Sequence, residues 1–302
     1  MDLIAAEGIE KRFGQLTALR DISLRVRRGE LYGLIGPDGA GKTTFFRILT
    51  TLMLPDGGRA TVDGLDIVTD YRRIRAAVGY MPGRFSLYPD LTVKENLEFF
   101  ATLFGTRLED NYDLIRDIYV QIEPFRSRRA GRLSGGMKQK LALCCALIHR
   151  PRVLFLDEPT TGVDVVSRHE FWDMLSGLKR QGITMLVSTP YMDEAVRCDR
   201  IALIQSGRLL SIDTPRGIIE NYPDALFEVR AENMRQLTDE IRKRCSPQSC
   251  FAFGRSLHVS FSRDDAEAPQ RMRAALTAAG CTNLEIAPIT PSIEDCFIQQ
   301  MR

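Results

Sequence analysis

The chain has 302 residues, 44% of them hydrophobic, which is enough to build the core of one large domain or of two ordinary ones. Lys and Arg total 41 and Asp and Glu total 39, and the net charge of +2 argues against a protein whose main activity is nonspecific nucleic-acid binding. No apolar run approaches the ~20 residues that span a bilayer, and the seven cysteines lack CxxC spacing, so we expect a cytosolic protein that reaches any membrane through a partner.

The first predicted element with a chemical signature is a loop between the apolar strand Leu31–Ile35 and a helix that begins at Thr44. The loop has the complete GxxxxGK[ST] pattern, with Gly36, Pro37, Asp38, Gly39, Ala40, Gly41, Lys42 and Thr43. Glycines allow successive backbone N–H groups to turn toward a β-phosphate, and the helix N-terminus adds a positive dipole. Lys42 would then neutralise the β and γ oxygens, while the Thr43 hydroxyl would bind Mg²⁺. The pattern predicts a nucleoside triphosphate site.

Short apolar runs alternate with amphipathic stretches through about residue 212, which is typical of a mostly parallel sheet covered by helices. The predicted strands Val153–Leu156, Met185–Ser188 and Ile201–Ile204 are nearly continuous in apolar residues, as expected when helices cover both faces of a sheet. The segment from Gly136 to His149 predicts a helix. The fold class that we predict for this region is α/β.

A second glycine-containing helix start lies at Leu133-Ser134-Gly135-Gly136. A serine and paired glycines at a helix N-terminus form an anion-binding nest, but one nucleotide does not need two such nests. By itself the segment is equally compatible with a capping turn that binds nothing.

Two adjacent carboxylates, Asp157 and Glu158, follow the predicted strand Val153–Leu156. The carboxyl ends of parallel strands present ligands, so Asp157 is placed to hold the Mg²⁺ water shell opposite Thr43. Glu158 is placed to orient and deprotonate the water that attacks the γ-phosphate. The alternative is that both are strand-end charges in solvent.

The sequence changes character after a Pro/Gly break at residues 213–217. From residue 225 it predicts a strand, a helix, two strands around the turn at Gly254, a helix, a strand and a last helix from Pro291. This βαββαβ order indicates a small α+β ferredoxin-like domain. We therefore expect a nucleotide-binding domain at residues 1–217 and an accessory domain at residues 218–302, with one phosphate loop and no tandem repeat.

Together, the phosphate loop, the LSGG segment and the strand that ends in Asp157-Glu158 resemble the ATPase subunit of ABC transporters, over roughly residues 3–215. The resemblance implies a P-loop NTPase fold of the ABC ATPase type, with a helical subdomain at about residues 85–150. It implies ATP held by Gly36–Thr44 with Phe13 stacked on the adenine, Mg²⁺ held by Thr43 and Asp157, and Glu158 as the catalytic base. From sequence context alone, an aromatic such as Phe13 on an early strand is more often a core residue.

The resemblance also implies a head-to-tail dimer with a second nucleotide-binding domain, either identical or different. Ser134, Gly135 and Gly136 of one chain would contact ATP bound by the other, and Asp164 in the loop from Thr161 would lie at the interface. An ordinary type I turn after Pro159 is the alternative interpretation of that loop.

Two positions depart from the family pattern. Gly83 stands where relatives have a glutamine that touches Mg²⁺ and the attacking water, and Pro190 stands where they have a histidine that senses the γ-phosphate. Neither residue has a side-chain donor. Loss of one preorganised donor typically costs ~10²–10³ in rate, so we expect slow hydrolysis unless Thr189, Tyr191 or Arg84 compensates.

The predicted function is the ATP-hydrolysing subunit of an ABC export system, with drug efflux as the favoured cargo, because Pro291–Ile298 resembles the closing helix of exporter ATPases. A separate transmembrane permease subunit would hold it at the inner face of the cell membrane. The segment Leu87–Leu97 is expected to contact that partner or to be an ordinary helix start capped by Thr92 and Glu95. We expect no nucleic-acid partner. The alternatives are a regulatory ATP-binding switch with weak hydrolysis, a soluble non-transport ABC protein of translation or DNA repair, and a P-loop kinase.

Overall fold

The computed structural model describes residues 1–84 and 86–301. Contacts divide the chain into two compact units, Met1–Pro215 and Arg216–Arg302, and each unit has a hydrophobic core of its own. Among the helices of the described residues, none combines the length and the apolar character needed to cross a membrane.

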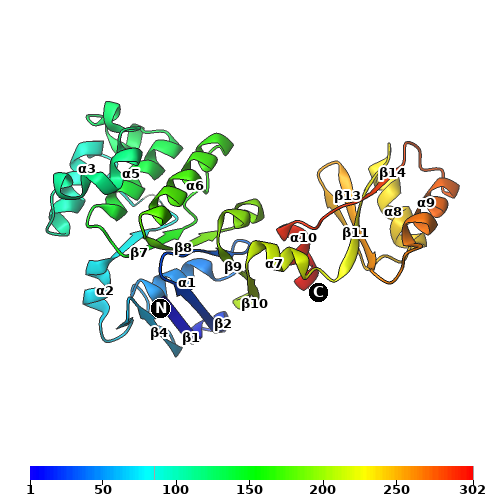
Figure 1. The fold of residues 1–302 in the computed structure, drawn as a ribbon, viewed down its shortest axis with the longest axis horizontal. Helices are drawn as coiled ribbons and strands as arrows, with labels where there is room; N and C mark the ends of the chain where they lie inside the picture. Colours follow the sequence, from blue (N-terminus) through cyan, green and yellow to red (C-terminus); the bar gives the residue numbers. More distant parts are fainter. Residues whose placement is uncertain (85, 302) are drawn as a thin grey trace. The chain divides into compact units, whose positions relative to one another are not determined.

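A six-stranded sheet with the order β10-β9-β3-β8-β7-β6 forms the centre of the first unit (Figure 1). Its parallel strands are β3 (Leu31–Ile35), β6 (Val78–Met81), β7 (Val153–Asp157), β8 (Thr184–Thr189) and β9 (Arg200–Gln205), and the antiparallel edge strand is β10 (Arg208–Asp213). The predicted α/β fold is confirmed. Because β3, β8 and β7 are parallel neighbours, their carboxyl ends bring the phosphate loop, Thr189 and Asp157 to one edge.

A second sheet of the first unit is antiparallel, with the order β2-β1-β4-β5. Its strands are β1 (Asp2–Phe13), β2 (Leu16–Arg27), β4 (Gly57–Val62) and β5 (Leu65–Asp66). Helix α1 (Lys42–Leu49) packs between the two sheets, and its Phe45, Phe46 and Ile48 join one core cluster with residues of both. Short apolar runs do not reveal these strands, because buried and exposed residues alternate along them, as in β2.

Five further helices complete the first unit: α2 (Tyr71–Ala77), α3 (Val93–Leu103), α4 (Tyr112–Tyr119), α5 (Gly135–Leu147) and α6 (Val165–Arg180). Short 3-10 helices lie at Leu108–Asn111, Glu123–Phe125, Ala130–Arg132 and Met192–Arg197. Helix α5 packs against α3, α4, α6 and β6, which explains why the residues from Leu141 to Leu147 are all buried. Helices α3 and α5 lie far from β1 and β2 (Figure 1), within the predicted helical subdomain, whose first residue, 85, is outside the described residues.

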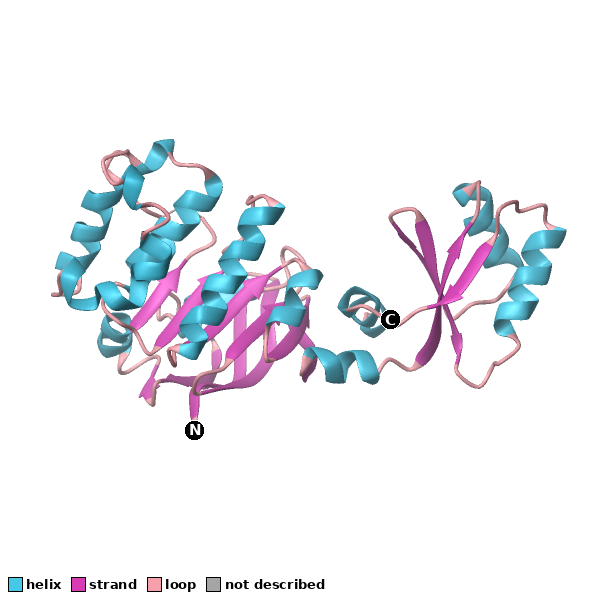
Figure 2. Ribbon diagram, turned by 45° about the horizontal axis from the view of Figure 1, so that its top comes forward, coloured by secondary structure: helices cyan, strands magenta, loops and turns pink. Residues whose placement is uncertain are grey.

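The second unit contains α7 (Pro215–Glu220), β11 (Asp224–Arg230), α8 (Met234–Arg244), β12 (Ser249–Phe253), β13 (Ser256–Ser262), α9 (Ala268–Ala278), β14 (Glu285–Pro288) and α10 (Ile293–Gln300). Its antiparallel sheet has the order β12-β13-β11-β14, and Figure 2 shows α8 and α9 together on one side of it. Leu237 and Ile241 of α8 and Met272 and Leu276 of α9 pack on this sheet. The predicted ferredoxin-like arrangement is confirmed.

Candidate functional site

The phosphate loop joins β3 to α1, and its shape depends on two glycines. An added Cβ at Gly36 would lie 2.2 Å from the carbonyl oxygen of Ile204, and one at Gly41 would lie 2.6 Å from the carbonyl oxygen of Ala18. Gly41 also has a φ of 107°, in the left-handed region. A larger residue at either position would therefore move the loop.

The loop borders a pocket of about 390 Å³. The pocket is lined by residues of the loop, of α1, of the antiparallel sheet, of the β7 end and of the turn between β9 and β10: Phe13, Leu16, Thr17, Ala18, Arg20, Gly39, Gly41, Lys42, Thr43, Thr44, Glu158 and Ser206. Phe13 is 46% exposed, with the ammonium of Lys11 5.8 Å from its ring centroid. Its interpretation as a core aromatic is therefore wrong, and its ring is available to a ligand at the pocket edge.

Lys42 is buried at the centre of the loop, with its side chain 2% exposed. Its ammonium donates to the carbonyl oxygens of Gly36 at 2.8 Å and Pro37 at 2.9 Å, and it lies 3.0 Å from a carboxylate oxygen of Glu158. The ammonium of Lys42 therefore lies at the position where the sequence predicts that the β and γ oxygens of a triphosphate bind.

Asp157 ends β7 as a buried carboxylate that is 1% exposed. The hydroxyl of Ser188 donates to its Oδ1 at 2.6 Å, and the Thr43 hydroxyl is a second hydrogen-bond partner. Burial raises the pKa of Asp157, while the hydrogen bonds from Ser188 and Thr43 lower it part of the way back. The Thr43 hydroxyl and this carboxylate are adjacent oxygen groups, and such a pair suits Mg²⁺ with several retained waters.

Glu158 follows in a sparsely populated backbone conformation, with a φ of 52°. Its N–H is held by two atoms of Ser188, the carbonyl oxygen at 3.1 Å and the hydroxyl at 3.0 Å. The side chain is one-fifth exposed and turns toward Lys42 at the pocket. The strained backbone is fixed by the neighbouring strand and directs the carboxylate to the same space as the lysine.

Ser134 and the paired glycines begin α5, where the Ser134 hydroxyl accepts from the N–H of Met137 at 3.4 Å. They lie beside the start of α6: an added Cβ at Gly136 would be 2.8 Å from the Ser167 hydroxyl. Among the described residues, those that line the Lys42 pocket do not include this segment. The structure therefore joins the phosphate loop, Phe13, Asp157 and Glu158 in one site but leaves Ser134, Gly135 and Gly136 outside it.

Asp164 caps α6 by accepting from the N–H of Ser167 at 3.0 Å. This hydrogen bond lowers the pKa of the Asp164 carboxyl. Two turn hydrogen bonds precede it, from Thr161 N to Glu158 O and from Val163 N to Thr160 O. The simple turn interpretation accounts for the loop within one chain, and Asp164 also begins the helix.

The two departures from the family pattern border the same site. An added Cβ at Gly83 would lie 3.0 Å from the carbonyl oxygen of Asp157 and 3.7 Å from the Cβ of Glu158. Pro190 directly follows Thr189, the last residue of β8.

Thr189 is not a free donor that could replace the missing histidine. Its hydroxyl donates to Glu194 at 2.5 Å and accepts from the N–H of Tyr191 at 3.1 Å. Tyr191 in turn stacks under the guanidinium of Arg168, 4.0 Å from its ring centroid. Compensation by the Thr189 hydroxyl would require these bonds to break.

The structure adds two residues to the predicted site, Ser188 and Glu194. Ser188 pairs with Asp157 in the parallel register, so the strand order could have identified it, but the strand order is not written in the sequence. Glu194 is a buried acid, 4% exposed, in the 3-10 helix Met192–Arg197. No sequence signal separates it from an ordinary surface glutamate, because its partners come from three other segments.

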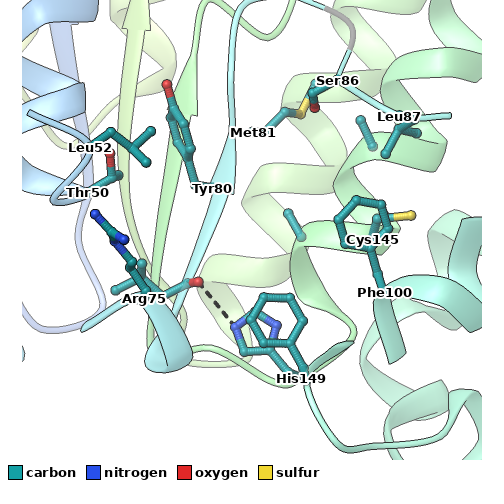
Figure 3. A pocket seen from close by; sticks show the side chains of 14 residues that line it. Thr50, Leu52, Arg75, Tyr80, Met81, Ser86, Leu87, Phe100, Cys145 and His149 are labelled. Atoms are coloured by element: carbon teal, nitrogen blue, oxygen red, sulfur yellow. Dashed lines mark hydrogen bonds between the residues drawn. The ribbon is translucent and has the colours of Figure 1, made fainter. Parts of the chain in front are cut away.

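A second hollow, of about 160 Å³, lies between β6 and α5 (Figure 3). Apolar side chains such as Leu52, Leu87 and Phe100 line it together with Arg75 and His149. The Nε2 of His149 donates to the carbonyl oxygen of Val78 at 3.2 Å, the dashed line in Figure 3. Burial lowers the pKa of His149, so the imidazole is neutral near pH 7.

The known proteins to which the chain is similar belong to one family. The sequence model of the family described as "ABC transporter" matches residues 19–161. The chain is 37% identical over 302 residues to "Probable multidrug ABC transporter ATP-binding protein YbhF" of Escherichia coli, and it spans about half, 51%, of that protein's length. It is 36% identical to "Nod factor export ATP-binding protein I" of Burkholderia lata, covering 96% of this chain and 94% of the relative. It is 42% identical to "Daunorubicin resistance ATP-binding protein DrrA2" of Streptomyces coeruleorubidus, over 71% of this chain and 68% of the relative.

Solved structures resemble the larger part of the fold. A structure described as an ATP-binding subunit of an ABC transporter matches with a TM-score of 0.66 and 26% identity, over 73% of this chain and 93% of the other. A nucleotide-free ATP-binding cassette matches with a TM-score of 0.61 and 25% identity, over 71% of this chain and 92% of the other.

Proposed function

Because the chain belongs to the family of ABC transporter ATP-binding proteins, we propose that it binds ATP and hydrolyses it to drive export through a separate transmembrane partner. The observation that carries this proposal is that Lys42, Thr43 and Glu158 line one pocket at the ends of β3 and β7, with the buried Asp157 hydrogen-bonded to Thr43.

ATP would enter the pocket with its triphosphate on the loop from Gly36 to Thr44. Lys42 would exchange its ion pair with Glu158 for the phosphate oxygens, and this exchange would free the carboxylate to act as the base. Phe13 would stack on the adenine, which its exposed ring supports.

Thr43 and Asp157 would hold Mg²⁺, which supplies charge neutralisation at the β and γ oxygens when it is bound. Ser188 would keep the Asp157 carboxylate oriented, and its hold on the Glu158 N–H would aim the base at the attacking water. The residues of this chain thus bind, orient and accept the proton.

A second nucleotide-binding domain would complete the site. The exposure of Ser134 and its position outside the Lys42 pocket support a role toward ATP on a second chain. The N-terminus of α5 would then supply N–H donors to the γ-phosphate, and Asp164 at the start of α6 would lie at the same interface.

The transmembrane partner would dock at the hollow between β6 and α5 and on the neighbouring start of α3. The hollow is lined largely by apolar side chains, and Tyr88 and Phe99 beside it are 47% and 39% exposed. These two rings pack edge to face at 4.7 Å. Docking there would place the chain at the inner face of the cell membrane, and the names of the relatives favour drug efflux as the cargo class.

A regulatory ATP-binding switch with weak hydrolysis is the second candidate, and Gly83 and Pro190 favour it, because neither has a side-chain donor for the reacting phosphate. Phosphate release by the assembled membrane complex with Mg²⁺ and ATP decides between the two. Lys42→Ala should weaken ATP binding by ~10-fold or more in a direct titration, since a charge-assisted contact is lost. Unchanged affinity in that variant would remove the loop from the nucleotide site, and binding without turnover in the assembled membrane complex would favour the switch.

A further inference from the structure

Glu194 is a buried carboxylate that lies outside the pocket and yet joins three of the segments around it. It is 4% exposed and accepts hydrogen bonds from Thr160 Oγ1 at 2.8 Å, Thr189 Oγ1 at 2.5 Å and Arg168 Nε at 3.0 Å. A buried charge is tolerated when its oxygens are hydrogen-bonded and an opposite charge is near. The three donors meet that need, so movement of any one of them would leave the carboxylate poorly satisfied.

The bond from Thr189 fixes the loop at Pro190. The Thr189 hydroxyl donates to Glu194 and accepts from the N–H of Tyr191, so it spans Pro190 from one side to the other. The carbonyl oxygen of Thr189 accepts from the N–H of Gly36, the first residue of the phosphate loop, at 3.2 Å. The same residue therefore connects Glu194 to the phosphate loop.

The bonds from Thr160 and Arg168 fix the segment after the catalytic carboxylates. Thr160 lies two residues after Glu158 and is fully buried. Arg168 lies one turn into α6, beyond its cap Asp164, and it also pairs with Asp193 at 3.2 Å and covers the Tyr191 ring. The ends of β7 and β8 and the start of α6 are thus held to one carboxylate.

We propose that Glu194 is a positioning residue for ATP hydrolysis, which holds the Glu158 segment and the Thr189-Pro190-Tyr191 loop in the geometry that the reaction requires. This inference rests on the proposed hydrolytic function. At Pro190 the chain has no side-chain donor, so the order of this loop depends on the bonds of its neighbours to Glu194. The free energy needed to order the loop in the transition state is smaller for a rigid loop than for a mobile one.

The test compares Glu194→Gln with wild type in steady-state hydrolysis and in ATP titration. The amide keeps the shape of the side chain but loses the charge that pairs with Arg168 and one of the two acceptor oxygens. We expect kcat to fall ~10–100-fold with the ATP Kd unchanged, because misplacement affects the reaction more than the phosphate cradle. The matched control is Asp173→Asn, which removes an exposed ion pair between α6 and Arg197 of the same 3-10 helix and should leave kcat at the wild-type value.

A hydroxyl series at Thr189 keeps the proposal testable if Glu194→Gln folds poorly. Thr189→Ser retains the hydroxyl and should keep most of the wild-type kcat, whereas Thr189→Val removes it at nearly constant volume and should lower kcat as Glu194→Gln does. Equal kcat in wild type, Glu194→Gln and Thr189→Val would overturn the inference, and so would a change confined to the Kd. Absence of hydrolysis by the wild-type complex would instead contradict the proposed function.

Discussion

The hydroxyl of Ser188 links the two carboxylates that the proposed chemistry needs. It donates to Asp157 and accepts from the backbone N–H of Glu158, at 2.6 Å and 3.0 Å. The same side chain therefore influences the charge of the proposed magnesium ligand and the direction of the proposed base. A serine at the end of a buried strand has this effect only because β7 and β8 are paired in register.

Ser188→Ala should weaken Mg²⁺ binding, most strongly at low pH. Burial already raises the pKa of Asp157, and the variant removes the hydrogen bond that opposes this rise, so the pKa moves higher still. Protonation as the pH falls through the raised pKa removes the negative charge that a cation needs. A hydrogen bond to a charged group contributes ~1.5–3 kcal/mol, so the apparent Mg²⁺ Kd should rise about tenfold or more.

The Mg²⁺ requirement for ATP binding or turnover, titrated at several pH values, measures this effect. Ser176→Ala is the matched control, because it also removes a hydroxyl that is hydrogen-bonded within the first unit, to the Trp172 carbonyl on α6. Identical Mg²⁺ curves for wild type and Ser188→Ala at every pH would show that the hydroxyl has no influence on Asp157.

The residues that the sequence identifies are those that stand in linear patterns. The loop from Gly36 to Thr43 and the pair Asp157-Glu158 carry their chemistry in their spacing, and the structure brings them together through the ion pair of Lys42 with Glu158 and the hydrogen bond of Thr43 with Asp157. Ser188 and Glu194 contribute through hydrogen bonds to residues 26 or more positions away, apart from the bond between Thr189 and Glu194. Their contribution depends on strand order and helix packing, which residue spacing along the chain does not determine.

The loop after β8 is a short element whose conformation is fixed from both sides, and it contains the strongest departure from the family pattern. Pro190→His would place an imidazole donor in a loop that Glu194 and Tyr191 already hold. A preorganised donor at a site of developing charge is typically worth ~10²–10³ in rate. We expect kcat of the isolated chain to increase toward that extent, with little change in the ATP Kd.

Pro190→Ala is the control for this substitution, because it restores the backbone N–H and frees φ without adding a side-chain donor. Equal rates for Pro190→His and Pro190→Ala would attribute any gain to the backbone. Fast hydrolysis by the isolated wild-type chain would contradict the expectation that the missing side-chain donor slows the reaction. Gly83→Gln is a less direct test of the missing donor, because the added Cβ would lie 3.0 Å from the Asp157 carbonyl oxygen.

Elements are predicted well where one periodicity dominates. Strands β3, β7, β8 and β9 are nearly continuous apolar runs, and the first helix that the sequence predicts after residue 225 is found over Met234–Arg244. The N-terminal antiparallel sheet is harder to identify, because β1 and β2 mix charged and apolar residues over twelve positions each and their pairing contains register shifts. Helix α1 and the phosphate loop pack against this antiparallel sheet. The sequence motifs therefore do not include all of the residues that position the site.

The assembled molecule is expected to be a nucleotide-dependent dimer. Among the described residues that line the pocket, Ser134 is absent, and in the proposed function it would contact the γ-phosphate of ATP bound by a second chain. Glu158→Gln should lower kcat by ~10²–10⁴, the usual contribution of a general base, while the phosphate cradle keeps its affinity. ATP should then trap a dimer on size-exclusion chromatography, and Ser134→Arg in the same background should prevent the trap. A monomer with undiminished turnover would exclude Glu158 as the base.

The two compact units are expected to fold and unfold independently of each other. The core of the first unit is formed by residues between Leu3 and Ile204, and the core of the second by residues between Val229 and Leu276. No residue of the described chain is common to these two clusters, and hydrophobic burial is the main stabilising contribution within each. The residues proposed to hold ATP all lie in the first unit. A chain that ends at Gly217 should therefore unfold cooperatively and bind ATP with a Kd within about twofold of the full chain, a difference below ~0.5 kcal/mol.

The complementary chain, residues 216–302, should show a cooperative thermal transition of its own, because its sheet and the helices α8 and α9 enclose a complete core. Circular dichroism with thermal melting, together with ATP titration of both pieces, checks these expectations. Removal of the second unit should leave hydrolysis by the isolated chain unchanged as well, since none of its described residues lines the pocket of the first unit. Failure of the chain ending at Gly217 to fold, when the full chain folds and binds ATP, would mean that the second unit stabilises the first and that the proposed boundary between two domains is wrong.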